Sequence, residues 1–218
     1  SIAAGHTACV RQLIDAKANL EASLYQANGT ALIAAARRGK MDCLQVLVDA
    51  RANIEARSDT GRTALMLVAS DGHIEGVQLL LSAQADIDAK DEGGGTALLY
   101  AAAQGHAECA QLLAEAKADI EIRDVSGKSA LMSALDNGHI ECLRLLIHMK
   151  ADVDVKDDVS DSTALMSAVA AGYTECVQLL IDAKACINFK SKFSVSALQY
   201  AVVDGKVASL QRLLDAKA

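Results

Sequence analysis

Apolar residues recur with a helical period over short stretches of the chain, and a glycine separates each stretch from the next. In residues 95–119 the first stretch places four apolar residues on one helix face, Ala97, Leu98, Ala101 and Ala102. A second stretch has the i, i+3, i+4 and i+7 spacing of a helix, at Cys109, Leu112, Leu113 and Ala116. Isolated helices shorter than roughly 12 residues are marginal in water. The pattern therefore predicts a helix pair that buries its apolar face against a neighbouring pair.

This helix pair is repeated along the whole chain. Thr or Ser followed by Ala-Leu stands at Thr30, Thr63, Thr96, Ser129, Thr163 and Ser196. The spacings between these positions are 33, 33, 33, 34 and 33 residues. The glycine between the two helices keeps the same period, at Gly5, Gly39, Gly72, Gly105, Gly138, Gly172 and Gly205. We expect a single array over residues 1–218, with half a repeat in 1–29 and repeats that begin at residues 30, 63, 96, 129, 163 and 196.

Three features of the repeat have local physical reasons. The Thr or Ser caps the first helix, because its hydroxyl oxygen accepts a hydrogen bond from an amide in the first turn. The carboxylates of Glu75, Glu108, Glu141 and Glu175 fall in the first turn of the second helix, where the helix dipole favours negative charge. Segments such as 85–94 alternate and end in turn residues, which predicts an extended arm closed by a hairpin.

The 33-residue helix-turn-helix unit resembles the ankyrin repeat. The ankyrin pattern G-x-T-P-L-H-x-A-A-x-x-G-H-x-E is similar to residues 61–75 and 95–108, with Ala in place of Pro. The resemblance covers essentially the whole chain. It implies an all-α solenoid of helix-turn-helix repeats with short β-hairpin arms, and a family function of holding other proteins with these arms and the adjacent first helices.

The chain departs from the ankyrin pattern after each second helix. The glycine that the family has there is replaced by Lys17, Arg51, Gln84, Lys117, Lys150, Lys184 and Lys217. We predict that these residues take the left-handed conformation that normally belongs to glycine. The conformation costs a non-glycine residue on the order of 1 kcal/mol, and a cation at the helix C-terminus offsets part of that cost.

Composition and charge exclude some classes of binding partner. Apolar residues make up 52% of the chain but aromatic residues only 3%, so the core must consist of small and aliphatic side chains. The formal charge of −7 argues against nucleic acid or an anionic membrane as partner, because both need a basic surface. No run approaches the roughly 20 apolar residues of a membrane span. We expect protein partners, no nucleic acid and no membrane insertion.

The last predicted helix has the same apolar residues as the interior copies, at Val207, Leu210, Leu213 and Leu214. Terminal repeats usually have a polar outer face. We therefore expect the chain to be a segment of a longer array, or its ends to be covered by a partner in a larger complex.

Five cysteines occupy one repeat position, Cys9, Cys43, Cys109, Cys142 and Cys176, and Cys186 lies apart in an arm. Neighbouring helices pack about 8 to 10 Å apart, which exceeds the ~5.5 Å between the Cα atoms of a disulfide. The same separation keeps the His–Cys pairs of successive repeats from converging on a zinc ion. We predict small buried residues, free thiols, no metal, and the cytoplasm or another reducing intracellular compartment.

Motifs for catalysis are missing from the sequence. No G-x-S-x-G elbow or glycine-rich phosphate loop follows a strand, and Gly93-Gly94-Gly95 falls in a predicted hairpin. The recurrent Ser, Thr and Glu residues have structural explanations in the repeat. We predict a protein that is not an enzyme, with no catalytic residue and no cofactor.

Residues that vary from repeat to repeat are free to be selected for a partner. At the arm tips they are Tyr25, Gln26, Asp59, Arg62, Glu92, Val125, Lys128, Asp158, Asp161, Lys192, Phe193 and Val195. At the ends of the first helices they are Arg37, Arg38, Ser70, Asp71, Gln104, Asp136, Asn137 and Asp204. The second helices instead repeat a Gln column. We predict a protein-interaction scaffold that binds through the first two sets, and a structural subunit of a large assembly stays open as the alternative.

Overall fold

The computed structural model describes residues 7–22 and 29–216. These residues form thirteen helices. The first helices of the repeats are α2 (Ala31–Arg37), α4 (Ala64–Ser70), α6 (Ala97–Ala103), α8 (Ala130–Asp136), α10 (Ala164–Ala171) and α12 (Ala197–Val203). The second helices are α1 (Thr7–Asp15), α3 (Met41–Asp49), α5 (Ile74–Ser82), α7 (Ala107–Glu115), α9 (Ile140–His148), α11 (Thr174–Asp182) and α13 (Val207–Asp215). The predicted all-α repeat fold is confirmed.

Hydroxyl caps define where the first helices begin. At each predicted cap the side-chain oxygen accepts a hydrogen bond from the amide three residues later, as Thr63 does from Met66 at 3.4 Å. The predicted glutamates also lie in the first turn of the second helices. In the arms, isolated antiparallel bridges join Arg123 to Ser129, Lys156 to Thr163 and Lys190 to Ser196. The arms are therefore short hairpins that lead directly into a capped helix.

The predicted left-handed residue follows the second helices α1, α3, α5, α7, α9 and α11. Six of these residues have positive φ angles, between +54° at Lys17 and +74° at Lys117, and Lys217 lies outside the described residues. The amide of Lys117 donates to the carbonyl of Ala114 at 3.1 Å, and that of Ala118 donates to the carbonyl of Leu113 at 3.0 Å. This hydrogen-bond pair is the Schellman arrangement, which satisfies carbonyl groups that the helix end leaves without partners. The prediction from the repeat register is confirmed.

The Lys117→Gly variant should be as stable as the wild type or more stable by up to about 1 kcal/mol, since relief of the left-handed strain outweighs the lost charge–dipole contact. Thermal unfolding monitored by circular dichroism measures the difference. The neighbouring Ala116→Gly, at a residue without a positive φ, should instead lose roughly 0.5 to 1 kcal/mol. A clearly lower melting temperature for Lys117→Gly would contradict the argument.

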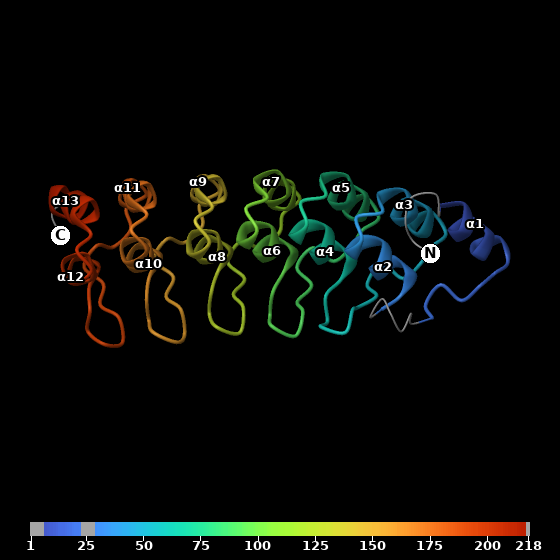
Figure 1. The fold of residues 1–218 in the computed structure, drawn as a ribbon, viewed down its shortest axis with the longest axis horizontal. Coiled ribbons are helices and arrows are strands. Elements are labelled where there is room, and N and C mark those ends of the chain that lie inside the picture. The colour runs from blue at the N-terminus through green and yellow to red at the C-terminus, as the bar shows by residue number, and fades with distance from the viewer. Residues whose placement is uncertain (1–6, 23–28, 217–218) are drawn as a thin grey trace. The chain divides into compact units, whose positions relative to one another are not determined.

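The chain separates into two compact units. Unit 1 comprises residues 1–101 and 108–119, and unit 2 comprises residues 102–107 and 120–218. In unit 1, α2 packs on α3 and α4; in unit 2, α10 packs on α8, α11 and α12. In each unit the first helices form one row, the second helices form another, and the arms extend from the row of first helices (Figure 1). The single array remains a prediction.

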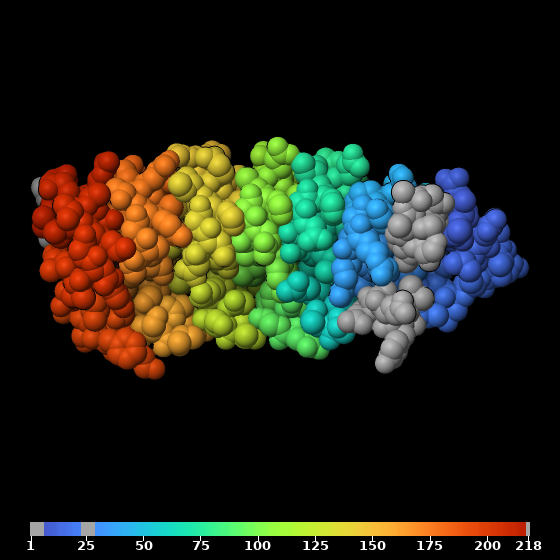
Figure 2. Space-filling view, viewed as in Figure 1, coloured from blue at the N-terminus to red at the C-terminus, as the bar shows by residue number. Residues whose placement is uncertain are grey.

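The core of each unit consists of small and aliphatic side chains. The four residues predicted for the apolar face of α6 are buried, and so is Leu99 on another side of that helix. Figure 2 shows side chains filling the space between successive repeats of each unit on the face in view. Of the predicted face of α7, Ala116 is exposed because the helix ends at Glu115. The helix α6 is thus buried on more sides than the single apolar face that the sequence predicts.

Carboxylates in the arms couple each repeat to the next within a unit. In unit 1 the carboxylate of Glu55 accepts a hydrogen bond from the amide of Asp86 at 2.8 Å. In unit 2 that of Glu121 accepts from the amide of Asp152 at 2.9 Å. The same bond recurs at Glu21 to Asn53, Asp88 to Asp119 and Asp154 to Cys186. These bonds hold consecutive arms in register.

Candidate interaction surface

Each arm tip is a turn that one polar side chain ties together. In the turn 124–128, the amide of Asp124 donates to the carbonyl of Lys128 at 3.0 Å. Its carboxylate accepts from the amides of Ser126 at 2.8 Å and Lys128 at 2.9 Å. Ser58, Asp91, Asp157 and Ser191 make related bonds in the other described arms. The tip backbone is therefore fixed before any partner arrives.

The arm 157–162 is one residue longer than the arm 124–128, which agrees with the 34-residue spacing between Ser129 and Thr163. Here the amide of Asp157 donates to the carbonyl of Ser162 at 3.0 Å, one residue further along than in turn 124–128. Burial alone would raise the pKa of Asp157, but hydrogen bonds from Ser160, Ser162 and Val159 outweigh burial and hold that pKa below its usual value. The longer turn is thus stabilised around an ionised carboxylate.

Two arginines at equivalent positions each join consecutive arms. The guanidinium of Arg57 donates to the carbonyl oxygens of Gly61 at 2.9 Å and Lys90 at 2.6 Å. Arg123 makes the equivalent pair of bonds in unit 2. Its Nη2 also lies 2.6 Å from Oδ1 of Asp158, a predicted surface residue. The arm tips of each unit therefore form a connected surface rather than independent loops.

Two pairs of predicted surface residues come together. Nη2 of Arg37, at the end of α2, lies 3.3 Å from Oδ1 of Asp59 on an arm tip. Nζ of Lys128 lies 2.5 Å from Oδ2 of Asp136 at the end of α8. The hydrogen bond to Asp136 raises the pKa of Lys128 above its usual value. At these two places an arm tip therefore lies next to the end of a first helix.

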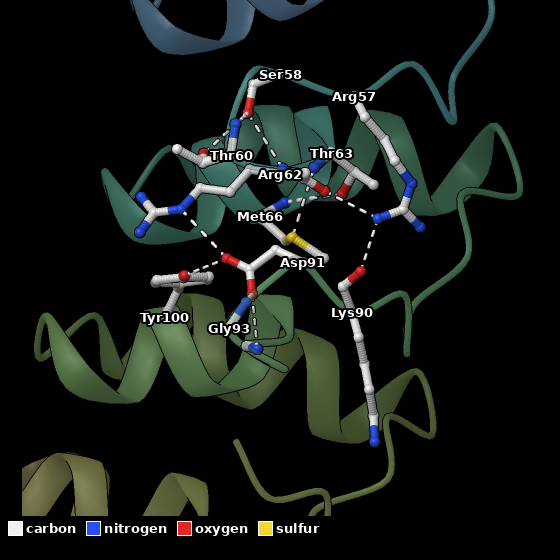
Figure 3. Close-up of polar contacts among 12 residues, drawn as sticks. Arg57, Ser58, Thr60, Arg62, Thr63, Met66, Lys90, Asp91, Gly93 and Tyr100 are labelled. Carbon is white, nitrogen blue, oxygen red and sulfur yellow. Dashed lines mark hydrogen bonds and ion pairs between the residues drawn. The ribbon is translucent and has the colours of Figure 1, made fainter. Parts of the chain in front are cut away.

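Arg62 points into the protein instead. Its Nε lies 3.5 Å from Oδ2 of Asp91, and its guanidinium carbon lies 4.1 Å from the centre of the Tyr100 ring (Figure 3). The Tyr100 hydroxyl donates to the same Asp91 oxygen at 2.5 Å. Burial and this hydrogen bond raise the pKa of Tyr100. The Arg62 guanidinium therefore interacts with Asp91 and Tyr100 within unit 1.

The remaining predicted residues lie on arm tips or at helix ends. Val125 is 75% exposed and Phe193 is 72% exposed, both on tips of unit 2. Ser70 and Val195 are half-buried, and the rest are exposed, namely Arg38, Asp71, Glu92, Gln104, Asn137, Asp161, Lys192 and Asp204. Tyr25 and Gln26 lie outside the described residues. Binding of a partner by these residues stays a prediction.

Sequence reasoning missed a hollow of about 460 Å³ in unit 2. It lies between the arm tips 124–128 and 157–162, over α8 and α10. Lys128 and Asp136 line it, and so do residues that were not predicted, Met132, Val159, Ser160, Ser162 and Ser167. Val159 is 69% exposed at its edge. An apolar residue inside an inserted turn was the signal that could have pointed here.

Four of the second helices have a glutamine that bonds a carboxylate in the same helix. Nε2 of Gln111 donates to Glu115 at 2.8 Å, four residues on along the exposed side of α7. The same i, i+4 bond joins Gln45 to Asp49, Gln178 to Asp182 and Gln211 to Asp215, each at 2.8 Å. Such pairs stabilise a helix by a few tenths of a kcal/mol, roughly 0.2–0.5. The glutamines of α3, α7, α11 and α13 therefore each have a partner within their own helix.

The cysteine column is buried at Cys43, Cys109, Cys142 and Cys176, where burial raises the pKa of Cys109 and Cys176. Cys9 is exposed, so its predicted burial is wrong; residues 1–6, which precede α1 in its repeat, are outside the described part. None of the six cysteines forms a disulfide in the structure. In the part of the chain that the structure describes, no group of His, Cys, Asp or Glu is arranged to hold a metal.

A thiol titration should distinguish two classes of cysteine. In the native protein the exposed Cys9 and Cys186 should react fast, and the four buried thiols should react slowly because they are shielded. At Cys109 and Cys176 the raised pKa should slow the reaction further. In denaturant all six should react. Fewer than six thiols in denaturant, or six fast thiols in the native protein, would contradict this assignment.

None of the helices in residues 7–22 and 29–216 is long and apolar enough to cross a membrane.

Comparison with known proteins agrees with the geometry. The family model described as "Ankyrin repeats (3 copies)" matches residues 1–91, 84–157 and 150–218. The crystal structure of EF0377, an ankyrin repeat protein, is similar with a TM-score of 0.79 and 26% identity, over 88% of this chain and 98% of that one. The ankyrin repeat domain of Bcl-3, a member of the IkappaB protein family, is similar with a TM-score of 0.81 and 27% identity, over 94% and 91%. A comparison with curated protein sequences found no match.

Proposed function

The chain belongs to the ankyrin repeat family, and we propose that it is a non-enzymatic scaffold that holds a protein partner with its arm tips and the ends of its first helices. Ankyrin repeats are in general protein–protein interaction modules, and stacked repeats present extended surfaces suited to this role.

The observation that carries the proposal is the group of exposed apolar side chains on the arm tips of unit 2. Val125, Val159 and Phe193 are each more than two-thirds exposed. Apolar side chains gathered on an exposed surface mark interaction sites, and buried aromatic anchors contribute most to binding. At the position equivalent to Val125, the tips of unit 1 instead have the charged residues Asp59 and Glu92. The two units would therefore contact chemically different parts of a partner.

The alternative of a structural subunit concerns what covers the exposed side of α12. Val202 on α12 is 62% exposed, whereas Val169 and Leu135, at the equivalent positions of α10 and α8, are 0% and 1% exposed. In those repeats the next helix pair covers the position. Either a further repeat or a neighbouring subunit of a larger assembly would cover Val202.

Partner capture tests the proposal. The immobilised chain and a triple variant, Val125→Asp, Val159→Asp and Phe193→Asp, are exposed in parallel to extract from the native source, and bound proteins are identified by mass spectrometry. Gln111→Ala is the matched control on the second helices. A partner retained by wild type and control but lost from the triple variant supports the proposal. Equal retention by all three chains would contradict it, and isolation of the native protein only within a fixed assembly would favour the structural subunit.

A further inference from the structure

Unit 1 shows what fills the space between two arms above a first helix. The ring of Tyr100 on α6 lies beneath the guanidinium of Arg62 from the preceding repeat, and its hydroxyl bonds Asp91 of its own arm (Figure 3). Asp91 also ties its turn through bonds from Gly93 at 3.0 Å and Gly95 at 2.8 Å. A phenol therefore sits between a cation and the turn-tying carboxylate.

Unit 2 repeats this arrangement without the phenol. Lys128 corresponds to Arg62 because each precedes a helix cap, and Asp157 corresponds to Asp91 because each ties its turn. The residue equivalent to Tyr100, four positions after the cap, is Ser167. The hollow of about 460 Å³ lies at this place, between Lys128, Asp157 and Ser167. The space that a tyrosine occupies in unit 1 is therefore open in unit 2.

We propose that this hollow is a receptor site for a tyrosine side chain of the protein partner. The inference rests on the proposed function, since it names the chemistry of the partner at one point of the same surface. The volume falls within the roughly 300–1,000 Å³ of small-ligand sites. The ring takes the place that the Tyr100 ring has in unit 1, with Met132 as an apolar and polarisable contact.

Charge and hydrogen bonding fit a phenol. The ammonium of Lys128, held by Asp136, provides the cation for the ring face, as Arg62 does for Tyr100. The carboxylate of Asp157 already accepts four hydrogen bonds, so the phenol hydroxyl would hydrogen-bond other groups of the hollow. These are the hydroxyls of Ser160 and Ser162, which lie 2.9 Å apart at the wall of the hollow.

Other occupants fit less well. A phosphate or carboxylate would face the carboxylates of Asp136 and Asp157, which repel it. The hydroxyls of Ser160 and Ser162 already bond each other, and that of Ser160 lies 2.8 Å from Asp157. A hydroxyl can take more than one hydrogen bond, and an aliphatic side chain would add none to either serine. An aromatic ring with a hydroxyl satisfies both the apolar and the polar parts of the lining.

The first test uses N-acetyl-tyrosinamide as probe on the wild-type chain. NMR should show saturable shifts of the Met132 methyl and of the Ser160 and Ser167 amides, with a Kd on the order of 10 mM, as expected of a small fragment. N-acetyl-alaninamide should shift none of these signals, and N-acetyl-phenylalaninamide should bind several-fold more weakly. Shifts no larger than those with the alanine probe, or tighter binding of the phenylalanine probe, would overturn the assignment.

The second test fills the hollow from within. Ser167→Tyr should fold, because the same repeat position holds Tyr100 and Tyr200, and circular dichroism checks this. It should abolish the probe shifts, while Ser167→Ala should keep them. With the captured partner, Ser167→Tyr should weaken binding on the order of 30-fold, the effect of losing a buried aromatic anchor. If the partner binds Ser167→Tyr normally but is lost from the arm-tip triple variant, the tyrosine site is wrong and the proposed function stands.

Discussion

The Gly127→Ala variant should lose roughly 2 to 4 kcal/mol of stability, because the added Cβ would both strain the backbone and overlap with atoms of the next arm. Gly127 has a φ of +77°, which a residue with a Cβ adopts only under strain. A Cβ placed there would lie 2.5 Å from Cγ and 2.7 Å from the amide nitrogen of Asp158, and in contact with the Arg123 guanidinium. A rotamer change cannot relieve the contact with a backbone atom. Moving that atom would disturb the bond from the Asp158 amide to the Ser126 carbonyl, 3.0 Å long.

Gly205→Ala is the matched control for this prediction. Gly205 also has a positive φ, +63°, and it lies in the same unit, but a Cβ there would meet no described atom within 4 Å. The Gly205→Ala variant should lose only about 1 kcal/mol of stability, from backbone strain alone. Urea unfolding of both variants measures the difference. Equal losses would show that the close approach of the two arms contributes nothing.

The Phe193→Ala variant should weaken binding of the protein partner on the order of 30-fold, because truncation of a buried aromatic anchor costs about 2 kcal/mol. Phe193 is exposed in the free protein, so its removal should leave the melting temperature unchanged. Titration calorimetry measures the affinity of the captured partner for Phe193→Ala and for the control variant Gln111→Ala. Gln111→Ala, whose side chain bonds Glu115 in its own helix, should bind almost as well as the wild type.

The reverse ranking at unchanged melting temperatures would move the interface to the second helices. In that case the exposed apolar tips would have another role in unit 2. The result with Phe193 is independent of the tyrosine site, because Phe193 does not line the hollow.

Most of the fold could be predicted because its determinants are local and repeated. A hydroxyl that caps a helix, as at Thr63, acts over three residues. The left-handed Lys117 could be predicted because the register on either side of it is unchanged. The exposure of Ala116 was missed because a periodic pattern does not state where a helix stops. The exposure of Cys9 was missed because burial depends on neighbours outside the helix.

The surface could be predicted only as a set of positions. Variation between repeats identifies which residues are free to change, but it does not state where their side chains point. Arg62 was predicted as a surface charge, yet its guanidinium stacks on Tyr100 because that ring lies within reach one repeat later. The hollow beside Ser167 depends on two arms and two helices together. Comparison of Tyr100 with Ser167 in sequence indicates a change of size, and the structure is needed to show the space.

The bonds from arm carboxylates to the amides of the next repeat have a consequence for how such a chain can evolve. The donor is always a backbone N–H, so the coupling does not depend on which side chain the next repeat has at that position. Asp152 and Cys186 donate in the same way, although their side chains differ in charge and size. A duplicated or exchanged repeat would therefore form this hydrogen bond with its neighbour without a compensating mutation. Selection could then act on the tips one repeat at a time.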